Sequence, residues 1–153
     1  MMKMTKAALN KLLVAERKKS RVKHQRSVFM SRTSGIYQGQ RNRHLELRGT
    51  NTLPYTLEQL RAKCEAALAL PCIYCGKKMT PKSMCGDHAK SLSRGGKFNL
   101  KNLVFIHANC NWRKGAMNDD EYHALSDWMT DNLPSDVIAD IWARLALGGK
   151  WKR

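Results

Sequence analysis

The sequence has no long hydrophobic run, and this absence excludes several classes of protein. No apolar stretch approaches the roughly 20 residues that a membrane-spanning helix needs. The most apolar part of the N-terminal region is interrupted by Asn10 and Lys11, so we expect no secretory signal peptide. Internal repeats are absent as well. The sequence therefore predicts a soluble, cytoplasmic protein without a membrane partner.

Cysteines are few, and their number is odd. The chain has five cysteines, and an odd number does not suit a disulfide framework. Three of them, Cys72, Cys75 and Cys110, stand at the spacing of metal ligands, while Cys64 falls on the apolar face of an expected helix. Free cysteines of this kind are typical of a reducing compartment.

Acidic residues are also scarce. The chain has 12 Asp and Glu against 28 Lys and Arg, a net charge of +16. Residues 1–50 contribute 13 basic and 2 acidic residues, which is +11 of that total. A polyanion is the natural partner for such a segment. A solvated tail or an anchor on anionic lipid are the alternatives, but the segment lacks the bulky apolar face that a lipid surface would bind.

Two pairs of potential zinc ligands bracket the middle of the chain, Cys72-x-x-Cys75 and His107-x-x-Cys110. Four Cys or His ligands in a tetrahedron make a closed structural zinc site, and Gly76 permits a tight turn after the second thiolate. A redox dithiol is the alternative for the first pair, but it would need a strand–helix context that is absent. Cys85 is an alternative fourth ligand in place of His107.

Hard ligands and a base stand inside this bracket. Asp87 and Asn111 offer oxygen atoms, which suit magnesium or manganese, and His88 has an ordinary pKa near neutrality. Each of these residues alone, and Asn102 with them, is more simply explained as a turn or helix cap. Together they favour a site that hydrolyses phosphodiesters.

The order of these residues resembles that of a known family. Asp87-His88, Ser93-Arg94-Gly95-Gly96, Asn102-Leu103-Val104 and Cys110-Asn111-x-x-Lys114-Gly115 are similar to the motifs of HNH nucleases in the subgroup with a zinc knuckle. Asn111 in the last position makes this the HNN variant. The chain departs from the pattern at Ala89-Lys90-Ser91, where an apolar pair and Pro are commoner, and at His107, where Cys is commoner.

The resemblance implies an activity and a role for each matching residue. It implies a metal-dependent endonuclease that leaves 5′-phosphate and 3′-hydroxyl ends on double-stranded DNA. His88 would be the general base, Asp87 and Asn111 would hold one Mg²⁺ or Mn²⁺, and Asn102 would brace the loop that orients the imidazole. The length and the basic segment are similar to those of small phage nucleases, including homing and nicking enzymes acting in an infected host cell. The alternatives are a non-catalytic zinc-stabilised DNA-binding protein and a basic RNA-associated zinc protein.

The expected fold is α+β, with a small ββα-metal core and a zinc knuckle, flanked by helices and a basic N-terminal arm. We expect a DNA-binding arm over residues 1–50, a nuclease core over 51–117 and a helical hairpin over 118–153. The chain would act as a monomer or a homodimer, with Trp128, Trp142 and Trp151 as possible interface anchors. The candidate DNA contacts are Arg41, Arg43, Arg94, Lys97, Arg113 and Lys114.

Local patterns predict the individual elements. In the arm, we expect a short helix over Thr5–Lys19 and an extended segment over residues 20–50, broken by Gly35, Gly39 and Gly49. A capping box at Thr56 and Gln59 predicts a helix over Leu57–Ala69. Further expected elements are strands over Ser83–His88 and Asn102–His107, a helix over Asn109–Ala116, a helix capped by Asn118 and a last helix capped by Ser135, with Val137, Ile138, Ile141, Trp142 and Leu145 buried.

Overall fold

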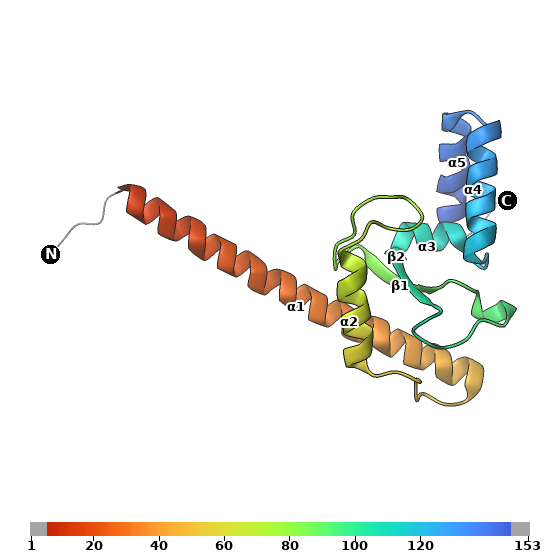
Figure 1. Ribbon diagram of the computed structural model, residues 1–153, viewed down its shortest axis with the longest axis horizontal. Helices are drawn as coiled ribbons and strands as arrows, with labels where there is room; N and C mark the ends of the chain where they lie inside the picture. Colours follow the sequence, from red (N-terminus) through yellow and green to blue (C-terminus); the bar gives the residue numbers. More distant parts are fainter. Residues whose placement is uncertain (1–5, 148–153) are drawn as a thin grey trace.

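The computed structural model describes residues 6–147, so Thr5, Trp151 and the Gly148-Gly149 pair lie outside the described residues. Within this range, helices surround a single two-stranded sheet (Figure 1). The elements are α1 (Lys6–Arg48), α2 (Leu57–Leu68), β1 (Met84–His88), the 3₁₀ turn η1 (Leu92–Arg94), β2 (Leu103–His107), α3 (Ala108–Lys114), α4 (Asp119–Asn132) and α5 (Ser135–Ala146).

The central unit is two antiparallel strands followed at once by a helix. The register pairs Met84 with His107 and His88 with Leu103, and α3 begins directly after β2. The predicted strands and the helix after them are confirmed to within two residues at each end. The α+β fold class is confirmed, with a helical chain built around one small sheet.

Helix α2 begins where its capping box predicts. The Thr56 side chain accepts a hydrogen bond from the Gln59 backbone, and the Gln59 side chain accepts one from the Thr56 backbone. Leu60 and Cys64 lie one turn apart and are fully buried. Cys64 is thus a core residue, and burial raises the pKa of its thiol to about 12.

The prediction of an extended segment over residues 20–50 is wrong, because α1 continues unbroken from Lys6 to Arg48. Phe29, Ile36 and Tyr37 follow one another at helical spacing and pack against the hydrophobic core. This packing outweighs the cost of two glycines within the helix. Only Gly49, at φ +72°, ends the helix as expected.

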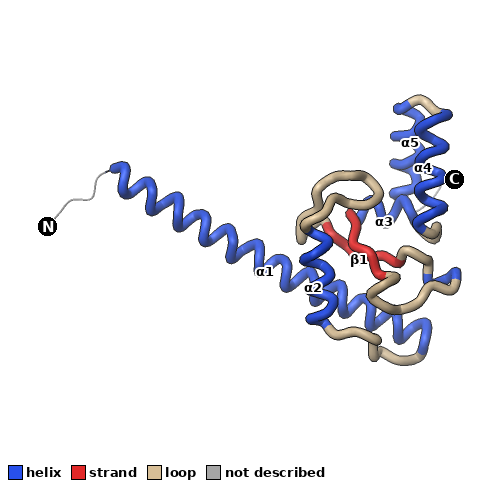
Figure 2. Tube along the Cα trace, viewed as in Figure 1, coloured by secondary structure: helices blue, strands red, loops and turns tan. Residues whose placement is uncertain are grey.

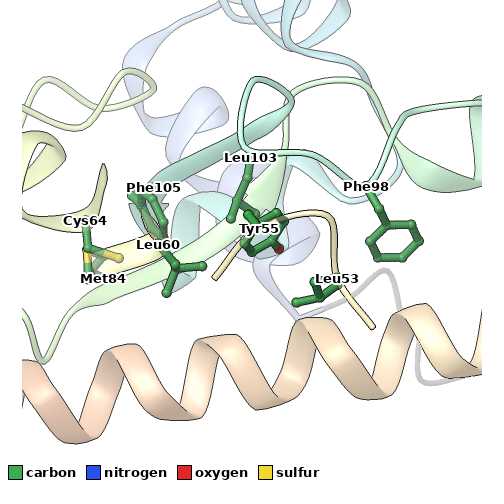
Figure 3. Packing of buried hydrophobic residues seen from close by; sticks show 8 residues of the cluster. All are labelled: Leu53, Tyr55, Leu60, Cys64, Met84, Phe98, Leu103 and Phe105. Atoms are coloured by element: carbon green, nitrogen blue, oxygen red, sulfur yellow. The ribbon is translucent and has the colours of Figure 1, made fainter. Parts of the chain in front are cut away.

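The second half of α1 packs closely on the sheet (Figure 3). A Cβ atom on Gly86 would lie 3.2 Å from Ile36 Cγ2, so the glycine lets the helix approach β1. Arg32 Nε donates a hydrogen bond to the Met84 carbonyl over 2.8 Å. The Tyr37 hydroxyl donates a hydrogen bond to the Tyr55 carbonyl. This half of α1 therefore belongs to the core.

The first half of α1 projects away from the rest of the protein as an uninterrupted helix (Figures 1 and 2). The side chains described between Lys6 and Ser27 are all exposed. Among the described residues, neither this helix nor any other is long and apolar enough to cross a membrane.

Helices α4 and α5 form a hairpin with its own small core of Tyr122, Met129 and Trp142. The predicted Asn118 capping box is confirmed. Two predictions here are wrong: Ser135 is the first helical residue, because Pro134 takes the N-cap position, and Val137 is 40% exposed.

Candidate functional site

Four potential zinc ligands converge between the knuckle, the end of β2 and the start of α3. One ligand atom from each of Cys72, Cys75, His107 and Cys110 lies within 4.8 Å of the other three. Zn–S bonds of about 2.3 Å place tetrahedral ligands about 3.8 Å apart, so the group has the size that zinc requires. Gly76 turns the chain after Cys75 with φ +66°, and its N–H donates to the Cys72 carbonyl.

Electrostatics within this cluster favour a bound cation. Burial raises the pKa of Cys72, but backbone N–H groups of His107, Tyr74 and Cys75 outweigh it and lower this pKa to about 7. Burial and the neighbouring thiols raise the pKa of Cys110. A bound Zn²⁺ would relieve this conflict because it takes thiols as thiolates.

The fourth member of the cluster is His107, not Cys85. His107 Nδ1 lies 3.3 Å from Cys75 Sγ. Cys85 is outside the group of converging ligands, and burial raises the pKa of its thiol to about 11. The cluster can therefore hold zinc with three thiolates and one imidazole.

A second site opens at the end of β1. Asp87 and His88 are neighbours on the strand, and a pleat sends neighbours to opposite faces, but β1 ends at His88 and both residues reach one pocket. Its volume is about 180 Å³. The pocket is lined by Gln40, Arg43, Asp87, His88, Ser91, Leu92, Ser93, Lys114 and Gly115.

His88 has the features of a proton acceptor. The residue is 8% exposed, and its ring makes a T-shaped contact with the Phe98 ring at 5.4 Å between centroids. Its Nε2 has no hydrogen-bond partner among the described residues. Burial, followed by the charges of Lys114 and Arg43, lowers the pKa of His88 to about 4. The imidazole is therefore neutral at pH 7 and has a free lone pair.

Lys114 is the most buried charged residue described, at 1% exposure. Its Nζ lies 2.9 Å from Asp87 Oδ2 and donates to the His88 carbonyl over 2.8 Å. Burial raises the pKa of the Asp87 carboxyl, and the hydrogen bond and charge of Lys114 oppose that rise. The sequence suggested Lys114 as a DNA contact, but its ammonium faces this pocket and not the outer surface.

The two asparagines have different surroundings. Asn102 Oδ1 accepts from the Lys90 N–H, and its Nδ2 donates to the carbonyls of Lys90 and Lys97, all within 3.0 Å. It thus joins the two ends of the loop that follows His88. Asn111 contacts the Cys85 thiol and is not among the residues that line the pocket. The structure does not bring it into the pocket with Asp87.

Residues 72–117 match the family model described as HNH endonuclease. We refer to this matched segment as the HNH domain. It contains the zinc-ligand cluster, both strands, α3 and the pocket residues from Asp87 to Gly115. No curated protein and no solved structure matches the chain. The family points to a nuclease or DNA-binding function.

The candidate DNA contacts lie in different places around the HNH domain. Arg43 lines the pocket, whereas Arg41 donates to the Asn51 carbonyl. Arg94 pairs with Glu121, and the guanidinium of Arg113 lies 5.8 Å from the ring centroid of Trp142. Lys97 lines a second, shallow pocket of about 360 Å³ together with Lys90, Gly95, Asn99, Lys101 and Asn102.

Sequence reasoning missed the residues that reach the HNH domain from outside its motif. Gln40 lines the pocket from α1, and its Oε1 is buried without a partner among the described residues. Asp119 on α4 lies 4.0 Å from Lys114 Nζ, and Tyr74 donates its hydroxyl to Asp119. No local pattern marks these residues, because their contacts join elements that are distant in the sequence.

Proposed function

We propose that this protein is a metal-dependent endonuclease that hydrolyses DNA phosphodiester bonds with water. The observation that carries the proposal is the pocket at the end of β1. His88, Asp87 and Arg43 all line this pocket. The His88 imidazole is neutral, and its Nε2 has no hydrogen-bond partner among the described residues. Asp87 offers a carboxylate and Arg43 a guanidinium. A base, a potential metal ligand and a phosphate-binding cation are the groups that this reaction needs.

In the proposed reaction, His88 Nε2 takes a proton from the attacking water. Phe98 packs against the ring, and Asn102 hydrogen-bonds the loop that follows His88. Arg43 binds a phosphate oxygen next to the scissile bond. The products would carry 5′-phosphate and 3′-hydroxyl ends.

A divalent metal fits the donor groups of the pocket. Mg²⁺ commonly binds through one or two carboxylates plus substrate phosphates and keeps several waters, so Asp87 suffices as the protein anchor. The HNH motif suggests Asn111 as a second ligand, but its side chain contacts the Cys85 thiol outside the pocket, so the proposal places the metal on Asp87. When bound, Mg²⁺ or Mn²⁺ would stabilise the negative charge that develops on the phosphate and the leaving oxygen.

We further propose that the N-terminal arm, residues 1–50, binds the DNA backbone, with the exposed part of α1 as the contact surface. Like charges lie four residues apart at Arg17 and Arg21 and at Lys19 and Lys23, a spacing that destabilises a helix. The exposed ion pair of Glu16 with Lys19 offsets little of this repulsion. A polyanion would remove the repulsion and release counterions as it binds.

In the rest of this proposed division, residues 51–117 form the nuclease core together with the second half of α1. Residues 118–153 form a C-terminal segment whose helices α4 and α5 pack against that core. Contact between Tyr74 of the HNH domain and the hairpin core supports this arrangement. The small size and basic arm support a setting like that of phage homing or nicking endonucleases, on the basis of resemblance alone.

The test is a cleavage assay on supercoiled plasmid with zinc-loaded protein. We expect nicked or linear DNA with Mg²⁺ or Mn²⁺ and none with a chelator of divalent cations. If the protein binds duplex DNA but leaves it intact at every metal concentration, a non-catalytic DNA-binding protein replaces the nuclease. Preferential binding of RNA in a competition assay would favour the RNA-associated alternative.

A further inference from the structure

Tyr74 connects the zinc-ligand cluster to another part of the protein. It stands between Cys72 and Cys75, and its ring packs against Tyr122 at 4.4 Å between centroids. The Tyr74 hydroxyl donates a hydrogen bond to Asp119 Oδ1.

Asp119 continues the connection toward the pocket. It is the first residue of α4, and its N–H donates to the carbonyl of Ala89, directly after His88, over 3.0 Å. The same Oδ1 that accepts from Tyr74 lies 4.0 Å from Lys114 Nζ. Asp119 therefore has one contact toward the zinc cluster and two toward the pocket.

Lys114 is the last link. A buried ammonium is costly unless it is paired and hydrogen-bonded, and Lys114 meets this requirement between Asp87 Oδ2, the His88 carbonyl and Asp119. The nuclease reaction proposed above gives this lysine no chemical step. Its charge also lies beside the carboxylate that a divalent metal would need.

We propose that Tyr74, Asp119 and Lys114 are positioning residues, which link the zinc-ligand cluster to Asp87 and make its carboxylate available to a divalent metal. The inference rests on the proposed function. Tyr74 holds Asp119 in place, and the Asp119 carboxylate attracts the Lys114 ammonium in competition with the Asp87 carboxylate. Without the attraction of Asp119, the Lys114 ammonium pairs with Asp87 alone and competes with the metal for the Asp87 carboxylate.

This competition predicts a specific effect on metal binding. Tyr74→Phe removes the hydrogen bond that holds Asp119, and Asp119→Asn removes the charge that attracts Lys114. Each should weaken binding of Mn²⁺ by about fivefold to tenfold, the change expected for one hydrogen bond or a partly buried charge pair. Because both variants act on one chain of contacts, the double variant should bind Mn²⁺ about as well as the weaker single variant.

The experiment measures Mn²⁺ affinity by electron paramagnetic resonance on the zinc-loaded, full-length protein without DNA. Tyr122→Phe is the matched control, because its ring lies in the same stack and no hydrogen bond of its hydroxyl is found among the residues described. Zinc content and melting temperature, measured on every variant, show that the fold and the cluster persist. Asp87→Ala should abolish the Mn²⁺ binding that Tyr74→Phe and Asp119→Asn only weaken.

Equal Mn²⁺ affinities for Tyr74→Phe, Asp119→Asn and Tyr122→Phe would overturn the inference, as would wild-type protein that binds no Mn²⁺. Additive effects in the double variant would also overturn it, since they would mean that the two residues act separately. Cleavage is a separate readout. Wild-type protein that binds Mn²⁺ through Asp87 but cuts no DNA would refute the proposed nuclease and leave the positioning chain supported.

Discussion

At the scale of single residues, His88 is defined by what surrounds it and not by its neighbours in the sequence. Phe98 packs on the ring, and Lys114 and Arg43 place positive charge near it. These surroundings disfavour the imidazolium, so the ring stays neutral well below pH 7. A neutral imidazole is the form of histidine that can accept a proton from the attacking water.

Replacing His88 by Ala should therefore lower the cleavage rate by about 10²–10⁴-fold, the usual contribution of a general base. Affinity for duplex DNA should be unchanged, because the buried ring is not a surface cation. Plasmid cleavage and filter binding measure the two effects. Cleavage by His88→Ala at the wild-type rate would remove His88 from the mechanism.

The lowered pKa of His88 also predicts how stability depends on pH. Between pH 6.5 and about 4, the unfolded chain binds a proton at His88 that the folded protein does not. The unfolded state is favoured as the pH falls through this window, by up to about 3 kcal/mol. Urea unfolding at pH 7 and pH 4.5 measures the decrease in stability.

Other groups also titrate in this range, and the raised pKa of Asp87 acts in the opposite direction. A His88→Gln variant isolates the histidine contribution, because glutamine keeps a polar side chain but does not titrate. The variant should lose less stability than wild type over the same interval. Equal decreases in both proteins would show that His88 is not buried in its neutral form.

At the scale of elements, local signals predicted local structure. The capping boxes at Thr56 and Asn118 specify where α2 and α4 begin, because all their hydrogen bonds lie within four residues. The zinc ligands were predictable because metal geometry restricts their spacing. The strands were predictable because the order of the HNH motif residues indicates where each strand lies.

Contacts between distant elements were not predictable. The second half of α1 reads as polar and rich in glycine, yet Ile36 meets Gly86 fifty residues later. From the sequence, Lys114 is indistinguishable from a surface cation. In the structure it is buried, because α3 packs on β1 and places its ammonium beside Asp87. In both cases the burial of a residue depends on its tertiary partner, and a pattern along one element does not reveal that partner.

The zinc-ligand cluster and the Asp87 pocket should respond differently to substitution. Cys72→Ser or Cys110→Ser should unfold the HNH domain, because a structural zinc site contributes its binding free energy to folding. Asp87→Ala should keep the bound zinc and abolish cleavage, and it should lower the melting temperature because the buried Lys114 ammonium loses its closest charged partner. Zinc content and thermal unfolding distinguish the outcomes. A Cys72→Ser protein that keeps its zinc and melts like wild type would show that the cluster is not a structural zinc site.

At the scale of the whole molecule, α1 joins two regions with different roles. Its first half extends into solvent, and its second half contributes Gln40 and Arg43 to the pocket. The sequence analysis assigned residues 1–50 to an arm and began the nuclease core at residue 51. Deletion to Asn51 would instead remove Ile36 and Tyr37 from the hydrophobic core, together with the hydrogen bond from Arg32 to β1. A truncation that tests the arm must therefore end before Phe29.

Deleting residues 1–27 should weaken binding to duplex DNA and reduce its dependence on salt. The exposed part of α1 carries eight Lys and Arg from Lys6 to Arg26 against the single acid Glu16. For every phosphate that the shortened protein no longer neutralises, the slope of log affinity against log salt should fall by about 0.9. Chemistry should survive when a short duplex is supplied at saturating concentration, because the pocket retains all its lining residues.

A substitution separates removal of charge from removal of the helix. Arg17→Gln with Arg21→Gln removes two cations one turn apart and relieves their repulsion, so the helix persists while the slope falls by up to about 1.8. Circular dichroism of the full-length variant checks the helix, and affinity over a salt series gives the slope. If the deletion and the double substitution both leave the slope at its wild-type value, the projecting half of α1 does not contact the DNA backbone. The binding surface must then lie around the pocket, at Arg43 of α1 and at Arg94 and Lys97 of the HNH domain.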